Sequence, residues 1–510
     1  MSAAAFRAAL PALRIASEPA ECAVLSADIA GPATVQAEAV LHPSHPEELA
    51  SLVRVARREG IALTPRGGGW SYTGGCTPTR RPTAIVATEG LQGLAIDRAA
   101  MTVTAGAGMT WGALHTALAA KGLRVPSFGP LSGAGATLGG LAAQNGGFFG
   151  AAGHGALADG SLRAVALVDG TGAPQRIDAA ARIGGAAAPQ PLAGDCGAFG
   201  IRSAVTLALM PEPPATGFAS FGFATGPAAL AGLLAVADLP GLGEAFVFDP
   251  GTHANLARTG FSVLETAALA GDLLRGTGGL LDRVGGLLRG ARAGRAFVAD
   301  LQWSLHLSCD GSAAAVAETL AEAARRAAAL GGDPLPDTLP RVTRARPFRR
   351  IKALLGPDGE AWLPLHGVFA PEAAPAGLAA CAATLDAAAE TMQRHGIRAV
   401  VLMVLMGRRV VIEPQLFWPD ALTPLHRLLA QPEQVRAYGA RPANPAARAA
   451  AHLLRQDLTA ALDAAGAAHF QIGRHYAADA GLPAGTRAAW LTLKRRMDPD
   501  GIMNPGALGI

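Results

Sequence analysis

The chain has 510 residues, half of them apolar and 16% charged, which indicates a globular protein of two or three domains. The net charge is +4, but the arginines are scattered and aromatic residues make up only 5%, which argues against a nucleic-acid-binding surface. Five cysteines without a CxxC pair argue against a disulfide framework or a structural zinc site and fit a reducing compartment.

The sequence shows no signal peptide and no apolar run near the ~20 residues that span a bilayer. We therefore predict a cytoplasmic protein whose contact with a membrane, if there is one, is peripheral.

The first 214 residues alternate between helical and strand-like patterns. A helix that ends at Gly60 is expected to have Ser44 as its N-cap and Pro46 in its first turn. A second helix is predicted at Trp111–Lys121. Strands are predicted at Ile61–Pro65, Ala84–Ala87, Met101–Ala105, Leu162–Val168 and Ser203–Met210. The proline cluster at 211–214 is expected to stop the sheet and to mark a domain boundary.

After Pro214 the pattern changes to strand–helix–strand units with neighbouring strands, which favours an α+β domain with an antiparallel sheet flanked by helices. Helices are predicted at Ala228–Ala237, at Ser312–Leu330 with Ser312 as the cap, at Leu378–His395, and at Pro445–Gly466 with Asn444 as the cap. Strands are predicted at Gly217–Phe223, Ala245–Phe248, Phe297–Leu307, Leu363–Phe369, Ala399–Leu405 and Val410–Phe417.

Two glycine-rich loops stand out, at Pro65–Gly75 and at Gly129–Gly147. Glycines let backbone N–H groups converge on an anion and let a large ligand approach the main chain closely. Two such loops suit one extended ligand that carries a diphosphate in its middle.

Both loops, together with segments Val103–Gly112, Ala166–Gly170, Gly197–Ile201 and Leu493–Gly506, resemble the PCMH-type FAD-binding domain of the FAD-linked oxidases. That family includes vanillyl-alcohol oxidase, p-cresol methylhydroxylase and the FAD-linked D-lactate dehydrogenases and glycolate oxidases, and in outline the chain is most similar to the last two. The resemblance implies an α+β protein with an FAD-binding domain of two α/β subdomains and an α+β cap domain. The implied divisions are an N-terminal segment (1–40), the FAD-binding domain (41–214), the cap (215–455) and a C-terminal segment (456–510) that returns to the FAD-binding domain.

The resemblance also implies which residues bind FAD. The residues implied are Arg66, Gly67, Gly68, Gly69, Trp70, Ser71, Tyr72, Gly133, Gly135, Ala136, Thr137, Gly139, Gly140, Asn145, Gly200, Ile201 and Asn504. Some relatives attach FAD covalently through a histidine in the first loop. Because Trp70 occupies that stretch here, we predict non-covalent FAD.

Oxidation of a hydroxyl group by a flavin needs a base for the hydroxyl proton and groups that hold the rest of the substrate. The catalytic candidates are His366, Glu413, His469, Arg474 and Tyr476, and a basic set of Arg346, Arg349, Arg350 and Lys352 lies upstream. Arg474 and Tyr476 would bind a carboxylate or phenolate. The metal motif of the lactate and glycolate branch is missing, so we predict no metal site; a cluster of His366, His469 and Glu413 is the alternative.

The function implied is oxidation of a small hydroxy compound, a 2-hydroxy acid such as D-lactate or glycolate, by hydride transfer to flavin N5. Oxidation of para-substituted phenols is the second interpretation, and a non-catalytic flavin-binding subunit is the third. Oxygen, a quinone or a cytochrome remain open as electron acceptors, and so does a homodimer.

Overall fold

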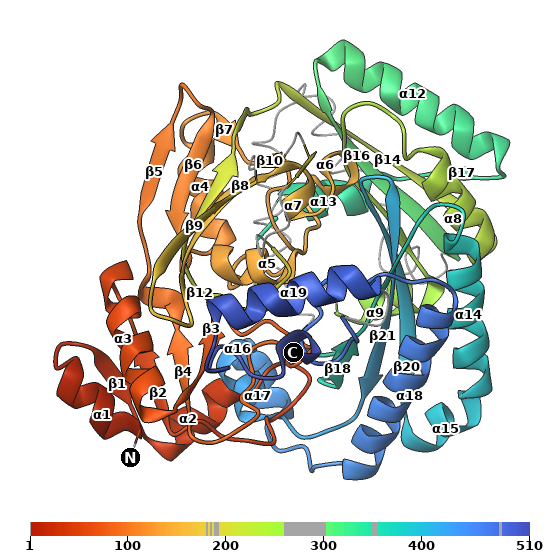
Figure 1. Ribbon diagram of the computed structural model, residues 1–510. Coiled ribbons are helices and arrows are strands. Elements are labelled where there is room, and N and C mark those ends of the chain that lie inside the picture. The colour runs from red at the N-terminus through yellow and green to blue at the C-terminus, as the bar shows by residue number, and fades with distance from the viewer. Residues whose placement is uncertain are drawn as a thin grey trace.

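The computed structural model describes residues 2–179, 182–183, 186–187, 193–259, 302–345, 347–348, 354–478 and 482–510. Two sheets from the first half of the chain lie on the left in Figure 1, and one large sheet from the second half lies on the right. These sheets, together with the helices that cover them, confirm the predicted α+β class.

The first sheet leads into the first glycine loop, which begins at the end of its edge strand β3. Its order is β1-β2-β4-β3, in which β2, β4 and β3 are parallel and β1 is antiparallel. Helix α3 (Pro46–Glu59) buries its apolar stripe in the same core. The strands are β1 (Arg14–Ala16), β2 (Ala39–His42), β3 (Ala62–Arg66) and β4 (Thr83–Ala87), accompanied by α1 (Ser2–Ala9), α2 (Pro19–Ser26) and the 3-10 turn η1 (Thr88–Gly90).

The N-cap of α3 is His45, so the prediction of Ser44 is wrong by one residue. The carboxylate of Glu48 accepts hydrogen bonds from the N–H groups of both Ser44 and His45, at 2.7 and 3.0 Å. This carboxylate satisfies the N–H groups of the two residues that precede Pro46.

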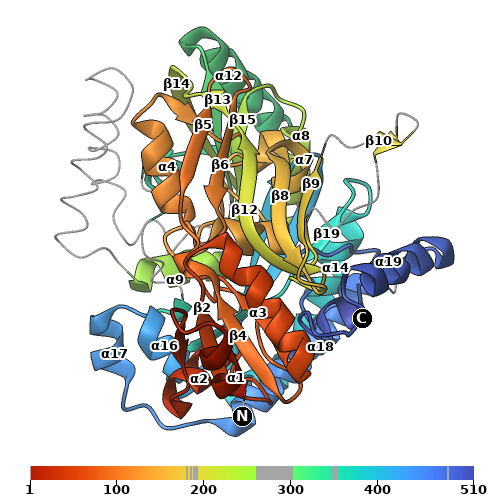
Figure 2. The ribbon, with the colours of Figure 1, turned by 60° about the vertical axis from the view of Figure 1, so that its left-hand side comes forward.

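The second sheet is antiparallel with the order β5-β6-β12-β8-β9, and it stands above the first sheet in Figure 2. Its strands are β5 (Leu94–Asp97), β6 (Thr102–Gly106), β8 (Leu162–Asp169), β9 (Pro174–Asp178) and β12 (Gly200–Ala208). Its helices are α4 (Trp111–Ala119), α5 (Leu138–Gln144), α6 (Ala151–His154) and α7 (Leu157–Gly160), and two short pairs are β7 (Leu123–Arg124) with β13 (Met210–Pro211) and β10 (Arg182–Ile183) with β11 (Ala186–Ala187).

The cap sheet is antiparallel, with the order β17-β14-β16-β15-β20-β21-β18 and with β19 also paired to β21. Its strands are β14 (Ala215–Phe223), β15 (Leu242–Phe248), β16 (Trp303–Gly311), β17 (Asp333–Leu335), β18 (Ala361–Pro364), β19 (Gly367–Phe369), β20 (Arg398–Met406) and β21 (Arg409–Trp418). The remaining helices are α8 (Gly226–Ala235), α9 (Pro250–Thr259), α12 (Ala313–Ala329), α13 (Thr338–Ala345), α14 (Ala374–Ala387), α15 (Ala389–His395), α16 (Pro424–Leu429), α17 (Pro432–Tyr438), α18 (Pro445–Ala464), α19 (Ala484–Met497) and the 3-10 turn η3 (Ala507–Gly509).

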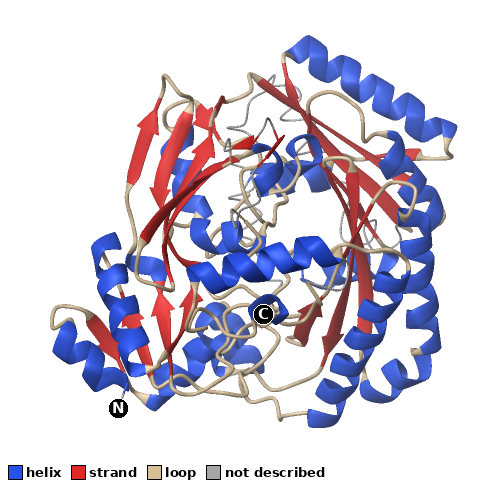
Figure 3. Cartoon of the chain, in the orientation of Figure 1, coloured by secondary structure: helices blue, strands red, loops and turns tan. Residues whose placement is uncertain are grey.

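The two faces of the cap sheet have different partners, because side chains alternate along a strand. Met403 and Ile412 face the core that α8, α14 and α18 cover, on the outer side in Figure 3. Val404 and Val411 face the opposite way and join the core of the second sheet. The second face is therefore turned towards the first half of the chain.

Several predicted elements differ in detail. The strand expected at Leu363–Phe369 is broken into β18 and β19, because the amide of His366 leaves the ladder and donates to the hydroxyl of Tyr476. The last strand of the second sheet, β12, ends at Ala208 just before the proline cluster, and Pro211 pairs with Leu123 in the separate two-stranded sheet of β7 and β13. The helix expected at Leu378–His395 is two helices that meet at Ala388. Residues 297–301 of one predicted strand lie outside the described residues.

The C-terminal segment returns to the first sheet. Leu63 in β3 donates to the carbonyl of Ile502 and accepts from the amide of Asn504, both at 2.8 Å. The division of the chain into four segments stays a proposal; residues 455 and 456 lie within the continuous helix α18. Of the helices that the structure describes, none is both long and apolar enough to cross a bilayer.

Candidate cofactor and active site

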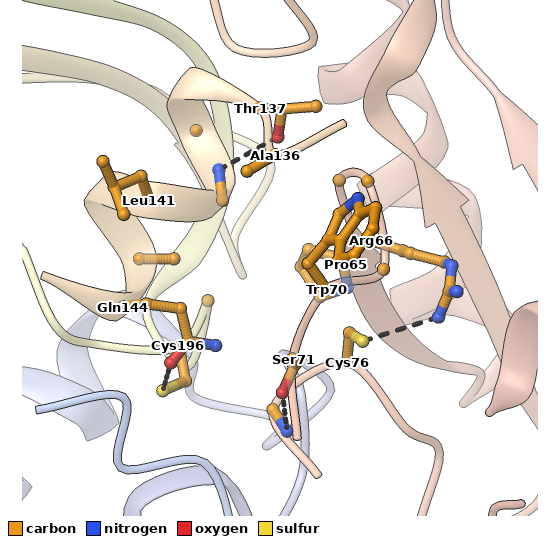
Figure 4. A pocket seen from close by; sticks show the side chains of 18 of the residues that line it. Pro65, Arg66, Trp70, Ser71, Cys76, Ala136, Thr137, Leu141, Gln144 and Cys196 are labelled. Atoms are coloured by element: carbon orange, nitrogen blue, oxygen red, sulfur yellow. Dashed lines mark hydrogen bonds between the residues drawn. The ribbon is translucent and has the colours of Figure 1, made fainter. Parts of the chain in front are cut away.

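A cleft of about 950 Å³, open to solvent, lies where the two glycine loops meet. In Figure 4, Trp70 and Arg66 lie on the first loop, and Leu141 and Gln144 lie across the cleft on α5. Most of the predicted FAD-binding residues line this cleft: Arg66, Gly67, Gly68, Gly69, Trp70, Ser71, Tyr72, Ala136, Thr137, Gly139, Gly140 and Gly200.

The N-terminal segment holds the first loop in place. The buried carboxylate of Asp28 accepts hydrogen bonds from the amide of Gly74 at 2.7 Å and from the hydroxyl of Ser71 at 3.3 Å. Burial raises the pKa of Asp28, and the hydrogen bond from Gly74 opposes that rise. The side chain of Arg66 is anchored in turn on the carbonyl of Ala27, at 2.6 Å. Asp28 could not be identified from the sequence, because only folding brings it to the loop.

The first loop offers free hydrogen-bond donors, whereas the two glycines at the start of α5 have paired amides. Within the described part of the chain, no protein group accepts from the amides of Gly68, Gly69 and Trp70. By contrast, the amide of Gly139 donates to the carbonyl of Ala107, and that of Gly140 donates to the hydroxyl of Thr137. Unpaired amides in a glycine loop favour an anion such as a diphosphate.

The two loops touch where only glycine fits. A Cβ atom at Gly67 would collide with the hydroxyl of Thr137, and one at Gly68 would collide with the carbonyl of Gly135. The side chains of Arg66 and Arg202 also line the cleft, although Arg202 forms an ion pair with Asp195 at 2.6 Å. Free amides and a close glycine cradle fit the diphosphate of FAD.

Some predicted residues shape the cleft without lining it. A Cβ atom at Gly133 would collide with the ring of Phe348, so this glycine serves packing on the far side of the second loop. Gly135 faces the indole of Trp70. Asn145 ends α5 in the left-handed conformation, with φ of 53°, and accepts from the amide of Ala158. Ile201 is buried in the core of the first sheet.

The buried side chain of Asn504 links two residues that line the cleft, Gly75 and Cys196. Its side-chain amide donates to the carbonyl of Gly75 at 2.8 Å and to the carbonyl of Cys196 at 2.6 Å. Its carbonyl oxygen accepts from Arg474 at 2.6 Å. Sequence reasoning missed several lining residues that come from separate segments: Thr88, Ala107, Gln144, Cys196, Arg202 and Gln471.

Arg474 braces the first loop. Its guanidinium donates to the carbonyls of Gly74 and Pro505 and to Asn504, and its backbone amide donates to the carbonyl of Thr73. Its donors are thus directed at the protein. This geometry favours a positioning role over the substrate carboxylate contact expected from the sequence.

His366 and His469 come together, as the sequence suggested, and Tyr476 joins them in place of Glu413; these side chains bond to one another and to the backbone. His366 Nε2 lies 2.8 Å from the carbonyl of Phe470, so that nitrogen carries the proton, and Nδ1 faces the Tyr476 hydroxyl at 3.4 Å. His469 Nδ1 donates to the carbonyl of His366, and Nε2 pairs with Asp463 at 2.6 Å. Burial lowers the pKa of His366 to about 3.

This arrangement favours a structural role for the two histidines over the catalytic role expected from the sequence, because all their ring nitrogens face groups of the protein. It also corrects the alternative metal cluster. In the part of the chain that the structure describes, no three His, Cys, Asp or Glu side chains gather as metal ligands. The basic set of Arg346, Arg349, Arg350 and Lys352 lies outside the described residues.

Glu413 differs from the other candidates. It lies on the face of β21 that turns towards the first half of the chain, the face on which Val411 also lies. Desolvation by the surrounding protein raises its pKa to about 7, although a hydrogen bond from Gln415 opposes the rise. Only Oε1 is bonded, to Gln415 Nε2 at 2.7 Å. Oε2 has no partner among the described residues and is not sealed from solvent.

Aromatic side chains connect Glu413 to the cleft. The indole N–H of Trp362 in β18 donates to the carbonyl oxygen of Gln415 at 3.0 Å. The ring of Trp362 meets Tyr72 edge-on, with centroids 6.1 Å apart, and Tyr72 lines the cleft. Burial raises the pKa of Tyr72, and the charge of Glu413 adds to the rise. Glu413 is therefore close enough to Tyr72 for its charge to act on a residue of the cleft wall, although Glu413 itself does not line the cleft.

Residues 37–178 match the model of a family described as FAD binding domain. A D-lactate dehydrogenase of Archaeoglobus fulgidus is 36% identical over 109 residues, which are 21% of this chain and 24% of the relative. The match thus spans about a quarter of that protein's length.

Solved structures share the fold over nearly the whole chain. p-Cresol methylhydroxylase has a TM-score of 0.69 at 15% identity, covering 100% of this chain and 96% of that one. 4-Ethylphenol oxidase from Gulosibacter chungangensis has a TM-score of 0.67 at 16% identity, with the same coverage. An alkyldihydroxyacetonephosphate synthase has a TM-score of 0.63 at 15% identity, covering 92% of this chain and 76% of that one.

Proposed function

Because the chain carries a PCMH-type FAD-binding domain, we propose that it is an FAD-dependent oxidoreductase that oxidises a hydroxy compound, with Glu413 as the proton acceptor. The family match confirms the prediction of FAD as the cofactor. When bound, FAD supplies the acceptor for the hydride that leaves the substrate carbon.

We assign the diphosphate to the first loop, where the amides of Gly68, Gly69 and Trp70 are free. Thr137 and Gly140 would form the opposite wall. Trp70 offers no nucleophile for a covalent link. The expected result is that acid precipitation of the protein releases all of its flavin into the supernatant; flavin retained in the pellet would contradict this.

The observation that carries the proposal is Glu413, a carboxyl group on the cap sheet near Tyr72 of the cleft, with its pKa raised to about 7. A general base works best when its pKa lies near the working pH. Gln415 holds one oxygen of the carboxylate, which leaves Oε2 to take a proton from the substrate hydroxyl. The apolar neighbours Val411 and Leu402 limit water around it.

Two substrate classes have support. The sequence similarity to a D-lactate dehydrogenase favours a 2-hydroxy acid such as D-lactate or glycolate. The aromatic surroundings of Glu413, formed by Tyr72 and Trp362, favour an aromatic alcohol or a para-substituted phenol. The names of two neighbours in the fold, 4-ethylphenol oxidase and p-cresol methylhydroxylase, point in the second direction.

The test is anaerobic bleaching of the bound flavin by a panel that contains D-lactate, glycolate, 4-ethylphenol and vanillyl alcohol. We expect one class to bleach the flavin and Glu413→Gln to slow bleaching by about 100- to 10,000-fold. Glu390→Gln on the exposed surface of α15 is the matched control. No bleaching by any compound would favour the non-catalytic flavin-binding subunit, and full activity of Glu413→Gln would remove Glu413 from the reaction. Reoxidation by oxygen, a quinone or cytochrome c then identifies the acceptor.

A further inference from the structure

We infer that Gln415 and Trp362 are positioning residues that keep Glu413 ready to accept a proton, because Trp362 fixes which end of the Gln415 amide faces the carboxyl group. This inference rests on the proposed function of Glu413. It concerns two side chains of the cap sheet that need not touch substrate or FAD.

The orientation of the amide follows from the chemistry of its two partners. An indole nitrogen can only donate a hydrogen bond, so Trp362 Nε1, at 3.0 Å, requires the carbonyl oxygen of Gln415. The NH₂ group must then face Glu413 Oε1, at 2.7 Å. A carboxylate can only accept, so this orientation matches the ionised form of Glu413.

The opposite orientation would favour the other protonation state. If the amide rotated by half a turn, its carbonyl oxygen would face Glu413 and would need a donor, which only the protonated acid provides. The indole N–H of Trp362 would then face the NH₂ group and lose its partner. Trp362 therefore opposes the rotation and stabilises the form of Glu413 that accepts protons.

No other described group bonds to the Glu413 carboxyl, so Gln415 is the single direct hydrogen-bond contact through which its proton affinity is tuned. Two further titratable groups feel its charge: Tyr72 from the first loop and Tyr476 from the segment after α18. The pKa values of both phenols are raised, by burial first, so both stay neutral. The residue opposite Glu413 in β20 is Leu402, which carries no charge.

The test uses Trp362→Phe, which keeps an aromatic ring on the side of Tyr72 and removes the indole N–H together with part of the ring system. We expect the pKa of Glu413 to rise by about 0.5 to 1.5 pH units. Infrared titration of the FAD-free protein measures this directly, with the band that disappears in Glu413→Gln as the assignment. The pH profile of anaerobic flavin bleaching should shift upward by the same amount.

Trp418→Phe is the matched control. Trp418 is the last residue of β21, the strand that carries Glu413, and its indole N–H donates to Asp420 at 3.1 Å. This variant should leave the Glu413 titration unchanged. Gln415→Leu should raise the pKa as well, and adding Trp362→Phe to it should change nothing further, because no amide remains to orient.

The outcomes separate the two claims. An unshifted titration in Trp362→Phe, or an equal shift in Trp418→Phe, would overturn the inference while leaving Glu413 as the base. If Glu413→Gln bleaches as fast as the wild type, the proposed function fails, but the infrared titration still decides whether Trp362 and Gln415 tune the carboxyl.

Discussion

A carboxyl group whose pKa rises to about 7 on folding costs stability when it ionises. For Glu413 the unfolded chain has the ordinary value of 4.5, so the folded state binds the proton more tightly. Between these two values stability falls as pH rises, and above about pH 7 the whole cost is present. Below pH 4.5 the cost is absent.

Glu413→Gln should therefore be more stable than the wild type at pH 8, by up to about 3 kcal/mol, and nearly equal to it at pH 4.5. Thermal unfolding of both proteins at the two pH values measures the difference. A gain of the same size at both pH values would show that ionisation of Glu413 is not its cause. The higher stability of the Glu413→Gln variant would then come from packing alone.

The fully buried side chain of Asn504 makes three hydrogen bonds, to Gly75, Cys196 and Arg474. Asn504→Ala leaves two buried carbonyl oxygens and one guanidinium N–H without partners, so it should destabilise the protein by about 2–4 kcal/mol. It should also weaken FAD binding, because Asn504 no longer links Gly75 and Cys196, which line the cleft. Denaturant unfolding and flavin release on dilution test these effects, and unchanged values for both would contradict the bridging role.

At the scale of elements, the contact between the two glycine loops depends on the absence of side chains. Gly68→Ala would push its Cβ atom into the carbonyl of Gly135, and backbone cannot yield as a flexible side chain does. We expect FAD affinity to fall by at least about tenfold, measured by fluorescence titration. Gly485→Ala in α19, where a Cβ atom meets nothing, is the control and should bind FAD normally. Equal affinity in both variants would refute the loop contact.

The sequence predicted the elements and the first loop well, because these depend on local patterns. The caps at Ser312 and Asn444 are confirmed by their side-chain hydrogen bonds. The missed features depend on distant contacts: the break at His366 exists because Tyr476 takes its amide. A local sequence pattern cannot predict a hydrogen-bond partner such as Tyr476, which is about a hundred residues away in the chain.

The same limit explains the site. Glycine spacing identified the loops, but it could not distinguish Gly68, whose amide is free, from Gly133, which packs against Phe348. Arg474 and the histidines were chosen for their chemistry, and their partners redirect that chemistry to structure. Glu413 kept its role as a candidate because its apolar strand pattern already implied an unusual environment.

At the scale of the whole molecule, a buried charge network ties the cap sheet to the first half of the chain. Arg344 in α13 binds Glu244 in β15 and, at 2.7 Å, Asp310 in β16. Asp310 also binds Arg124 in β7, at 2.8 Å, and Glu244 accepts from the amide of Gly150. The neighbouring arginines lower the pKa of Asp310 against the effect of burial. Four charges thus balance inside the interface.

Removing one member should cost far more than removing a pair, because it leaves an uncompensated buried charge. We expect Arg344→Met to destabilise the protein by about 3–5 kcal/mol, and Arg344→Met with Glu244→Met to recover part of that loss. The exposed pair of Arg394 and Glu390 on α15 provides the control: Arg394→Met should cost at most about 1 kcal/mol.

Calorimetry shows whether Arg344→Met loses stability throughout the molecule or by separating the cap from the FAD-binding half. If the network holds the cap sheet to the FAD-binding half, Arg344→Met should separate unfolding into two transitions, while the wild type unfolds in one. Because the cleft and Glu413 lie on opposite sides of this interface, the same variant should also bleach its flavin more slowly at unchanged FAD content. A single transition with normal bleaching would show that the network contributes stability without setting how the two halves dock.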